Sequence, residues 1–330
     1  MILDSNSVEK MNFYGINRIK FLFIIDFEMK FPIIMELSEA KNFCLKYSID
    51  GAKNYIEDVD NMPYKNKLEI QKTPVSFEIY EKAFDNVVKN EMAGNSYLVN
   101  LTFKNHIEIN LSLPEIFYIS KSKYKLYFKN FSNEFVLFSP ETFINITGGK
   151  IYTYPIKGTI DAGIPDAKKI LLNDEKERAE HLTVVDLLRN DLNIVCNDVR
   201  VNRFCFTETV KTNFGELLQM TSEIEGKIKP EFNNRFGDIF YGMLPAGSIC
   251  GAPKRKTLEI IKDTEPQNRG YYTGIFGIYD GETLKSSVMI RFIERNGEDY
   301  YYRSGGGITV YSDVKREYNE MLEKIYIPVY

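Results

Sequence analysis

The sequence predicts a single domain that mixes α-helices with largely antiparallel β-sheets. Predicted strands arrive in adjacent runs separated by occasional helices, and they do not alternate strictly with helices as strands of parallel sheets do. No linker rich in Ser, Gly or Pro and no internal repeat divides the 330 residues. An apolar fraction of 44% and a charged fraction of 27% are typical of a globular chain with an ample core.

The first half of the chain contains several predicted strands. We expect a strand over Phe21–Phe27, a helix over Ser38–Tyr47 and, from helical periodicity, a second helix over 75–92. Further strands are expected over 96–103, 124–128, 135–139, 143–146 and 150–154. From Asp166 to Leu192 the pattern is helical with apolar residues on two opposite sides, which predicts a helix that is buried on both.

The second half continues the same mixture. Strands are expected over 198–206, 217–224, 270–279, 284–294 and 299–304, and helices over 231–241 and 313–325. A glycine-rich loop, Pro245–Pro253, leads into a helix that ends near Lys262. A second glycine-rich loop, Ser304–Ile308, is expected to join the last strand to the last helix.

Composition limits the possible functions. A formal net charge of −4 argues against nucleic acids and anionic membranes as partners. The apolar stretch Phe21–Ile25 is too short to cross a bilayer, and no signal-peptide pattern opens the chain. The four cysteines show no framework spacing and are expected to be reduced, so we expect a cytoplasmic protein. With only two histidines, the chemistry must depend on lysine, carboxylates or an oxygen-held metal ion.

A lysine lies where a core-forming strand should have an apolar residue. The run Ile151-Tyr-Thr-Tyr-Pro155-Ile-Lys157-Gly158-Thr159 begins as a β-branched, aromatic strand and then reaches a proline. An apolar setting favours a neutral amine, which can attack carbon. For an isolated lysine, a solvated side chain at a strand end is the commoner interpretation.

Three glutamates are candidate metal ligands. Glu317 and Glu320 lie three residues apart on the last predicted helix, beside an apolar stripe, and Glu180 lies on an apolar face of its own helix. A carboxylate in an apolar setting is costly unless it is paired or bound to a cation such as Mg²⁺. Solvated or ion-paired glutamates are the alternative, because such spacing alone is weak evidence.

The glycine-rich loops could bring backbone N–H groups close to an anion. Neither loop matches GxxxxGK[ST] or GxGxxG, so a nucleotide site is not supported, and tight turns without a ligand are the alternative. Arg291 at a strand end, with Tyr272 on a preceding strand, could grip a carboxylate. Glu141, which follows Phe138-Ser139-Pro140, could protonate a leaving hydroxyl group.

Taken together, these segments resemble the chorismate-utilising enzymes, the family that contains the anthranilate, aminodeoxychorismate, isochorismate and salicylate synthases. The similarity covers about Tyr97 to Lys324. It rests on long motifs: Tyr97-Leu-Val-Asn100-Leu, Ser139-Pro-Glu141, Pro155-Ile-Lys157-Gly-Thr159, Ala179-Glu180-His-Leu, Asp186-Leu-Leu-Arg189-Asn-Asp191, Pro245-Ala-Gly-Ser with Gly-Ala-Pro-Lys254, Arg269-Gly-Tyr-Tyr272-Thr-Gly, Gly305-Gly-Gly-Ile with Ser312-Asp313, and Glu317-Tyr-Asn-Glu320.

The resemblance implies an α+β fold in which two large, mostly antiparallel β-sheets pack face to face with helices on the outside. It implies one chorismate-binding domain over 1–330, with a shortened, divergent portion over 1–75 and the catalytic core over 76–330. The short first portion has no tryptophan and offers no place for the tryptophan-binding regulatory region of anthranilate synthases.

Within the family, the residues favour amination at C4. Members that add water at C2 have a lysine base where this chain has Leu98, and anthranilate synthases typically have alanine where Lys157 stands. Lysine within Pro-Ile-Lys-Gly-Thr resembles aminodeoxychorismate synthase component I. The implied reaction turns chorismate and ammonia into 4-amino-4-deoxychorismate, a step towards 4-aminobenzoate and folate. The alternative is the reaction of anthranilate synthase component I, which aminates C2 and releases pyruvate.

The resemblance also implies a role for each site residue. Lys157 would attack C2 and Glu141 would protonate the departing hydroxyl, while Glu180, Glu317 and Glu320 would hold Mg²⁺. The expected substrate-binding residues are Arg291, Tyr272, Ser248, Gly251, Gly305, Gly306, Gly307, Lys254, Asn100 and Gln219. Gln219 stands where many members have a histidine, so a proton-transfer role at that position is in doubt.

The remaining expectations concern partners and other classes of function. Cys250 lies in Ser-Ile-Cys-Gly-Ala and lacks the Gly-x-Cys-x-Gly setting of a glutaminase nucleophile, so the resemblance implies a separate glutamine amidotransferase subunit that supplies ammonia. In a non-catalytic chorismate-binding relative, at least one of the catalytic positions would lack the residue that the family's chemistry needs, and we find no such position in this chain. A phosphate-binding enzyme built on the glycine-rich loops would instead bind nucleotides.

Overall fold

The computed structural model describes residues 3–56, 67–212 and 215–329, and its described strands form two nine-stranded sheets. Every described strand pair is antiparallel. The first sheet runs in the order β11-β13-β10-β9-β16-β15-β1-β2, with β12 beside β13. The second runs in the order β14-β6-β18-β17-β8-β7-β3-β4, with β5 beside β6.

The bounds of the elements are as follows. The first sheet contains β1 (Phe21–Ile25), β2 (Ile33–Glu36), β9 (Thr142–Thr147), β10 (Lys150–Thr153), β11 (Ile156–Asp161), β12 (Cys196–Thr212), β13 (Gly215–Ile228), β15 (Ile275–Tyr279) and β16 (Leu284–Val288). The second contains β3 (Cys44–Ile49), β4 (Ala52–Lys53), β5 (Ile70–Thr73), β6 (Leu98–Ile109), β7 (Tyr124–Lys129), β8 (Glu134–Ser139), β14 (Gly251–Ala252), β17 (Phe292–Asn296) and β18 (Asp299–Ile308). The α-helices are α1 (Ser5–Ile16), α2 (Phe77–Met92), α3 (Leu113–Ile119), α4 (Ala167–Asn173), α5 (Glu175–Val195), α6 (Phe236–Met243), α7 (Gly247–Cys250), α8 (Lys254–Thr264) and α9 (Val314–Glu323).

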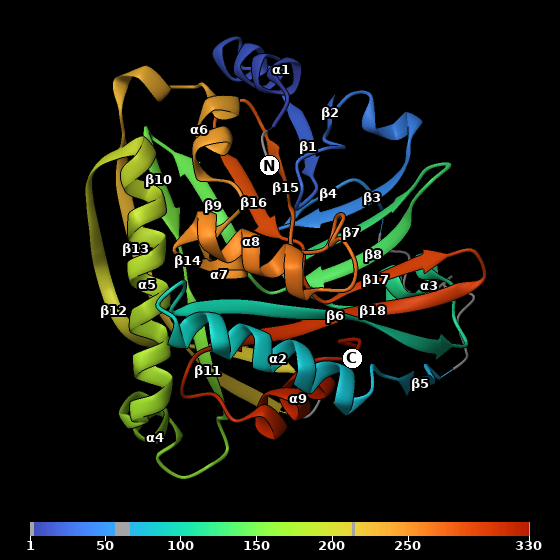
Figure 1. Ribbon diagram of the computed structural model, residues 1–330. Coiled ribbons are helices and arrows are strands. Elements are labelled where there is room, and N and C mark those ends of the chain that lie inside the picture. The colour runs from blue at the N-terminus through green and yellow to red at the C-terminus, as the bar shows by residue number, and fades with distance from the viewer. Residues whose placement is uncertain (1–2, 57–66, 213–214, 330) are drawn as a thin grey trace.

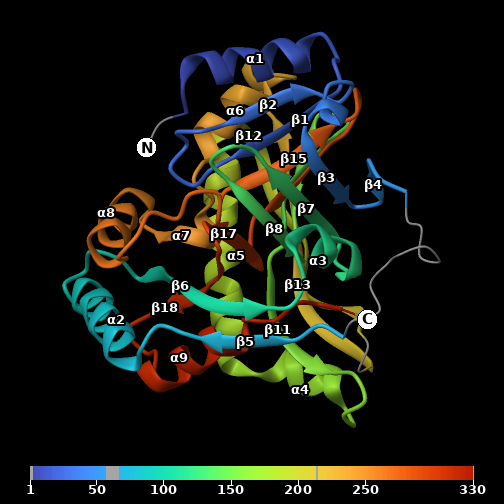
Figure 2. The same ribbon diagram turned by 90° about the vertical axis from the view of Figure 1, so that its right-hand side faces the viewer.

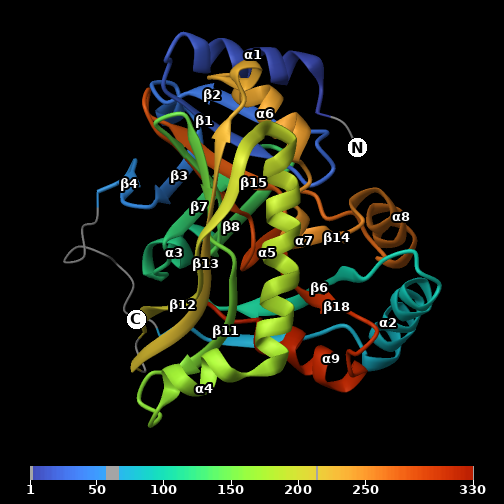
Figure 3. The ribbon, with the colours of Figure 1, turned by 90° about the vertical axis from the view of Figure 1, so that its left-hand side faces the viewer.

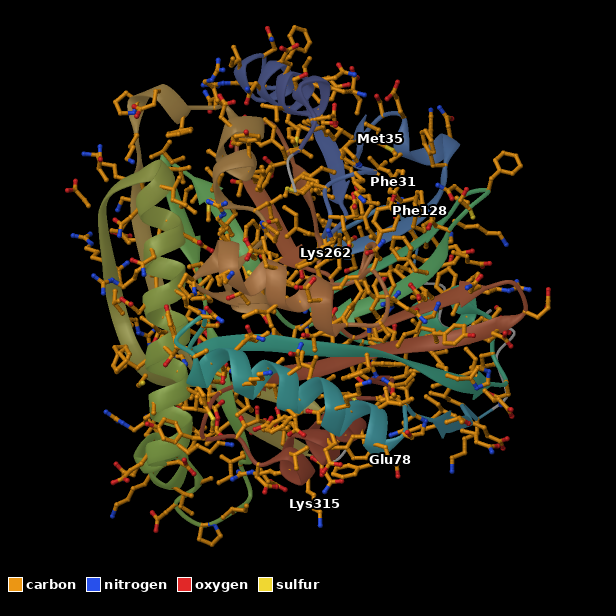
Figure 4. The ribbon with its side chains drawn as sticks, in the orientation of Figure 1. Phe31, Met35, Glu78, Phe128, Lys262 and Lys315 are labelled. Carbon is orange, nitrogen blue, oxygen red and sulfur yellow. The ribbon has the colours of Figure 1, made fainter. Side chains whose placement is uncertain are left out.

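The two sheets pack face to face, and β1 shows how. All five of its residues are buried. Because side chains alternate along a strand, Leu22 and Ile24 join the cluster between the sheets with Phe128 of β7, whereas Phe21 and Phe23 join the helix-covered core. Figure 2 shows β7 and β8 beside β1 and β15, and Figure 4 labels Phe128 and Met35 of this cluster. The α+β fold implied by the resemblance is confirmed.

Helices cover the outer faces. In Figure 1, α1 and α6 lie at one end of the first sheet, and α2 and α9 lie against β6 and β18 of the second. Figure 3 shows the long helix α5 along β12 and β13. The outer face of the second sheet packs on α3 and on residues near the end of the chain, including Ile325 and Ile327. In the described residues, no helix is both long and apolar enough to cross a membrane.

The prediction for α5 is half right. Val184, Val185 and Leu188 are buried, but Leu182 is 57% exposed. Leu182 lines an open hollow of about 680 Å³ together with Tyr97 and with Val201 and Phe204 of β12. Only one broad face of this helix therefore meets the core.

Three other predictions need correction. The segment Ser38–Tyr47 is not a helix: a single 3₁₀ turn over Ala40–Asn42 precedes β3, whose alternate residues are buried and whose backbone pairs with β7. Tertiary pairing here overrides local propensity. The helix α1 was not predicted. The expected strand over 284–294 is broken between β16 and β17, where Arg291 has a φ of +53°.

The second glycine-rich segment is a strand and not a loop. Gly305, Gly306 and Gly307 extend β18 and pair with Thr102, Leu101 and Asn100 of β6. A Cβ on Gly305 would lie 2.2 Å from the Leu101 carbonyl oxygen, so only glycine permits this approach.

The packing of α6 on α1 makes a testable prediction. A Cβ on Gly237 would lie 2.1 Å from the Val8 carbonyl oxygen, so Gly237→Ala should lower the free energy of unfolding by about 1–3 kcal/mol through overpacking. Gly242→Ala is the matched control, because its Cβ would meet only side-chain atoms, the nearest at 3.2 Å. Chemical denaturation of both variants measures the difference; equal stability of the two would contradict this account.

Candidate active site

The predicted catalytic residues gather in one charged cluster. Lys157 on β11 pairs with Glu180 on α5, with 3.5 Å between Nζ and Oε2. Glu141, which follows β8, lies within the electrostatic reach of Lys157 and Arg291. Glu320 on α9 also lies near Lys157. Burial raises the pKa of Glu320, but the paired Lys324 and, to a smaller extent, Lys157 lower it, and the net shift is downward. Segments more than 150 residues apart in sequence thus contribute to one site.

A bulge in β11 positions Lys157. The register with β13 shifts between Lys157 and Thr159, and the intervening Gly158 has a φ of +70°. A Cβ on Gly158 would lie 2.8 Å from Leu171 Cδ1 and 3.2 Å from Glu177 Oε2. The lysine side chain is 32% exposed and turns towards Glu180 instead of extending into bulk solvent.

Glu141 has the environment of a general acid. Burial raises the pKa of this carboxyl group, and the hydrogen bond from Ser248, followed by the charges of Lys157, Arg291 and Lys324, lowers it only in part. Ser248 Oγ donates to Glu141 Oε1 at 3.0 Å. The net rise in pKa favours the protonated form, which can give a proton to a leaving group.

The three predicted metal ligands lie near one another but are engaged by lysines. Glu180 pairs with Lys157 and, at 3.3 Å, with Lys176, and Glu320 Oε1 lies 2.8 Å from Lys324 Nζ. Among the described residues, no three His, Cys, Asp or Glu side chains are arranged to hold a metal ion. The lysines occupy carboxylate oxygens that a shared ion would need.

Glu317 is nevertheless a carboxylate that lacks a cation. It is 6% exposed, and no lysine or arginine pairs with it in the described part of the chain. Burial and then the charge of Glu320 raise its pKa. Carboxylate oxygens are the ligands that Mg²⁺ prefers. The donor set of Glu317, Glu320 and Glu180 therefore fits a divalent cation in its chemistry, provided that the lysines give up their contacts.

Arg291 is a partly buried cation in an aromatic setting. Its guanidinium carbon lies 5.0 Å from the ring centroid of Tyr326, and Tyr272 and Tyr302 are also close enough to interact with its charge. No carboxylate pairs with it among the described residues, and its buried Nε has no hydrogen-bond partner there. Burial also raises the pKa of Tyr272 to about 12, so this hydroxyl keeps its proton. An unpaired guanidinium beside a phenol suits a ligand carboxylate.

The first glycine-rich loop lies against the start of β6. Asn100 Nδ2 donates to the Ser248 carbonyl oxygen at 3.4 Å, and Gly251 pairs with Val99. Gly251 has a φ of +113°, and a Cβ there would lie 1.9 Å from the Leu98 carbonyl oxygen. The pairing thus requires glycine and brings Ser248 close to Glu141.

Lys254 and Gln219 have other surroundings. Lys254 Nζ donates to Asp191 Oδ1 and to the Met243 carbonyl oxygen, both at 2.7 Å, and the residue lines a separate hollow of about 710 Å³. These are structural partners. Gln219 pairs with Thr159 across β11 and β13, and no hydrogen bond described here joins its side chain to the charged cluster.

Sequence reasoning missed Lys324, Lys176 and Glu177. Lys324 Nζ donates to the Gly305 carbonyl oxygen at 2.9 Å as well as pairing with Glu320. Strand β17 pairs with β18 only as far as Arg303, so the Gly305 carbonyl oxygen is not used in that pairing and can accept the hydrogen bond from Lys324. The four-residue spacing from Glu320 to Lys324, and from Lys176 to Glu180, was a usable signal on predicted helices.

The fold and the site together define the class of protein. The chain belongs to the chorismate binding enzyme family, which matches residues 35–329, and so starts earlier than the motifs at Tyr97 indicate. Two PabA-like proteins are similar over nearly their whole length. The one from Haemophilus influenzae is 46% identical over 98% of this chain and 96% of its own, and the one from Pasteurella multocida is 47% identical over 98% of both.

Relatives with a named activity are more distant. Aminodeoxychorismate synthase component 1 of Bacillus subtilis is 30% identical over 77% of this chain and 55% of its own. Among solved structures, the menaquinone-specific isochorismate synthase from Escherichia coli has a TM-score of 0.73 at 14% identity, covering 97% of this chain and 79% of its own. Anthranilate synthase component I from Streptococcus pneumoniae has a TM-score of 0.68 at 24% identity, covering 79% and 59%. These structures support the shared fold.

The contacts of Lys254 make a second prediction. Lys254→Met leaves the Asp191 carboxylate, whose side chain is 8% exposed, without its cation, so the free energy of unfolding should fall by about 2 kcal/mol. Lys256→Met on the same helix is the control, because the Lys256–Glu259 pair is about half exposed and should contribute less than about 1 kcal/mol. Urea denaturation compares them. A smaller loss for Lys254→Met than for the control would show that the pair with Asp191 is not structural.

Proposed function

We propose that this enzyme aminates chorismate at C4 with ammonia and produces 4-amino-4-deoxychorismate through a covalent lysine adduct at C2. The observation that carries the proposal is the position of Lys157. It lies in the same charged cluster as Glu141 and Glu180, at a bulge that only glycine at position 158 permits. An amine and a protonated carboxyl group are the two groups that the reaction needs.

The reaction would proceed in two displacements. In the first, the neutral amine of Lys157 forms a bond to C2, the ring double bond shifts, and the C4–O bond breaks while Glu141 donates its proton, so that water leaves. In the second, ammonia bonds to C4, the double bond shifts back, and the C2–N bond to Lys157 breaks, which restores the neutral amine. The new ammonium group at C4 then returns a proton to the Glu141 carboxylate. The net change is loss of water and gain of ammonia, with no oxidant or reductant.

Binding of the substrate would rely on its two carboxylates. Arg291 and Tyr272 fit the enolpyruvyl carboxylate, because the buried Nε of the arginine has no hydrogen-bond partner and no carboxylate pairs with Arg291 among the described residues. Ser248, Asn100 and the backbone around Gly251 and Gly305–Gly307 would form the wall opposite the amine. Gln219 and Lys254 contribute at most through the strands and loop that they stabilise.

The glutamates would hold a magnesium ion against the ring carboxylate. Glu180, Glu317 and Glu320 supply the oxygen ligands, and the ion would offset the negative charge of the substrate. The protein's own part is to release these carboxylates from Lys157, Lys176 and Lys324. Because Glu180 both pairs with Lys157 and belongs to the ligand set, freeing this carboxylate also releases the Lys157 side chain from its ion pair.

The position of Leu98 supports amination over hydration. Leu98 lies against the glycine strand, where a Cβ on Gly307 would be 3.0 Å from Leu98 Cδ1. A leucine cannot activate water for attack at C2. We propose that ammonia comes from a separate glutamine amidotransferase subunit. Cys250 is buried, and burial raises its pKa to about 11, so this thiol is a poor nucleophile.

Identification of the product tests the function. Incubation of the enzyme with chorismate, Mg²⁺ and ammonium should give 4-amino-4-deoxychorismate without pyruvate. Release of pyruvate together with anthranilate would instead favour amination at C2. A thermal-shift comparison of chorismate plus Mg²⁺ with ATP separates both reactions from nucleotide binding.

Lys157→Ala tests the covalent route. The variant should lose the protein adduct that mass spectrometry detects in the wild type with chorismate and Mg²⁺, and its amination at C4 should fall by about a hundredfold or more. Lys176→Ala is the control, because Lys176 also pairs with Glu180 but lies outside the proposed chemistry. Full C4 amination by Lys157→Ala would rule out the adduct.

The pH dependence of kcat/KM tests the acid. Glu141 must be protonated to act, so activity is lost as the pH rises through its raised pKa. Ser248→Ala removes a hydrogen bond that lowers this pKa, so the alkaline limb should move to higher pH. A shift to lower pH would contradict the assignment. Glu141→Gln should abolish the limb.

A further inference from the structure

Arg269 lies at a junction of the segments that form the proposed substrate site. It is 1% exposed and is the largest of the fully buried side chains. Its guanidinium lies over the Phe27 ring, 4.5 Å from the centroid. Nε donates to Glu265 Oε2 at 2.9 Å and Nη2 donates to Glu265 Oε1 at 2.6 Å, which forms a bidentate pair.

The remaining donors of Arg269 reach three separate segments. Nη2 donates to the Asn100 carbonyl oxygen of β6 at 2.6 Å, and Nη1 donates to the Ile249 carbonyl oxygen of α7 at 2.8 Å. Nη1 also donates to Thr273 Oγ1 at 3.3 Å. Each acceptor lies within two residues of a proposed substrate-binding residue. Asn100 is itself one, Ile249 lies between Ser248 and Gly251, and Thr273 follows Tyr272.

Glu265 completes the connection to β6. Its Oε1 accepts hydrogen bonds from the Thr102 amide at 2.9 Å and from Thr102 Oγ1 at 3.0 Å. The side chain of Glu265 is 4% exposed, so both charges of the pair are removed from water. Such a pair contributes little net stability compared with apolar packing, but it allows only one arrangement of the groups around it.

The turn that carries Tyr272 is strained. Gly270 and Thr273 have φ values near +60°, and for a β-branched residue such as Thr273 this conformation is rare. A residue held in this way costs about 1–3 kcal/mol and persists only where its surroundings fix it. The Thr273 amide donates to the Met289 carbonyl oxygen, and the Arg269 and Gly270 amides both donate to Glu28. Arg269 is the side chain that joins this turn to α7 and β6.

We propose that Arg269, paired with Glu265, is a positioning residue that fixes Asn100, the Ser248–Gly251 segment and Tyr272 in the mutual arrangement that binds chorismate. This inference rests on the proposed function of the site. Arg269 itself touches no reacting atom, because its donors are all engaged by protein groups. Its loss should therefore weaken binding of the substrate much more than it slows the chemical step.

A second arginine–glutamate pair provides a control. Arg303 is 7% exposed, donates from Nε and Nη2 to Glu294 Oε1 at 3.1 and 3.0 Å, and donates from Nη1 to the Asn268 carbonyl oxygen. Arg303 is nearly as buried as Arg269, but the side chain of Glu294 is 20% exposed and also pairs with Lys104. None of the groups that accept its hydrogen bonds belongs to a proposed substrate-binding residue.

The test compares Arg269→Lys and Glu265→Gln with Arg303→Lys and Glu294→Gln. For the first two variants we expect KM for chorismate to rise by about tenfold or more, with kcat within about threefold of the wild type. Calorimetric titration with chorismate in the presence of Mg²⁺ should show the same loss of affinity. The two controls should lose similar thermal stability but keep KM within about twofold.

Several outcomes would overturn the inference. The first is an unchanged KM in Arg269→Lys and Glu265→Gln. The second is a KM that follows the melting temperature across all four variants, and the third is a fall in kcat without a rise in KM. If Arg269→Lys and Glu265→Gln do not fold, Thr273→Val and Thr273→Ser provide the test. Serine keeps the hydroxyl group that accepts a hydrogen bond from Arg269, and valine does not. KM should then rise for valine and not for serine. Failure of the wild type to bind chorismate would instead reject the proposed function.

Discussion

The site depends on a balance between acids and bases that come from distant parts of the chain. Glu180 on α5 and Glu320 on α9 have side chains that are 35% and 44% exposed and are paired with lysines, whereas Glu317 on α9 is 6% exposed and has no lysine or arginine paired with it among the described residues. Movement of either helix would leave carboxylates close to one another without their cations, which is most costly for the buried Glu317. The position of α9 against β18, and of α5 against β11 and β13, therefore has to be fixed by the packing of the sheets before the cluster can form.

Close backbone contact supplies much of that fixed geometry. β6 is approached on one edge by Gly251 of β14 and on the other by Gly305 of β18, and a side chain at either position would overlap a carbonyl oxygen of β6. The glycines that looked like anion-binding loops in the sequence thus act first as close strand contacts. Their effect on the ligand site is indirect but strong, because they set the distance between Asn100, Ser248 and α9.

Much of this arrangement could be predicted, and the failures have physical causes. Periodicity located α2, α5 and most strands, because these segments have a clear apolar face. It failed at Ser38–Tyr47, where pairing with β7 decides the conformation, and at Gly305–Gly307, where composition suggests a turn but the neighbouring strand β6 provides a ladder. The motifs predict that Lys157 and Glu141 belong to one site, and in the structure Glu141 lies within the electrostatic reach of Lys157. No local pattern could show that Lys254 would pair with Asp191, since this contact exists only in the folded chain. The four-residue spacing of Lys176 and Glu180, and of Glu320 and Lys324, does indicate their ion pairs on predicted helices.

The two arginines near the site show how structural and functional charges differ. Arg269 is almost without solvent and Arg291 is partly buried, and both border Tyr272. Arg269 has a carboxylate partner, and all of its hydrogen bonds end on protein acceptors, so the protein alone satisfies its charge and its donors. Arg291 has tyrosines and an unsatisfied Nε but no acidic partner among the described residues, and its own backbone is strained. The surrounding sheets hold this partly buried cation in place, and an anionic ligand is the partner that would satisfy its unpaired Nε.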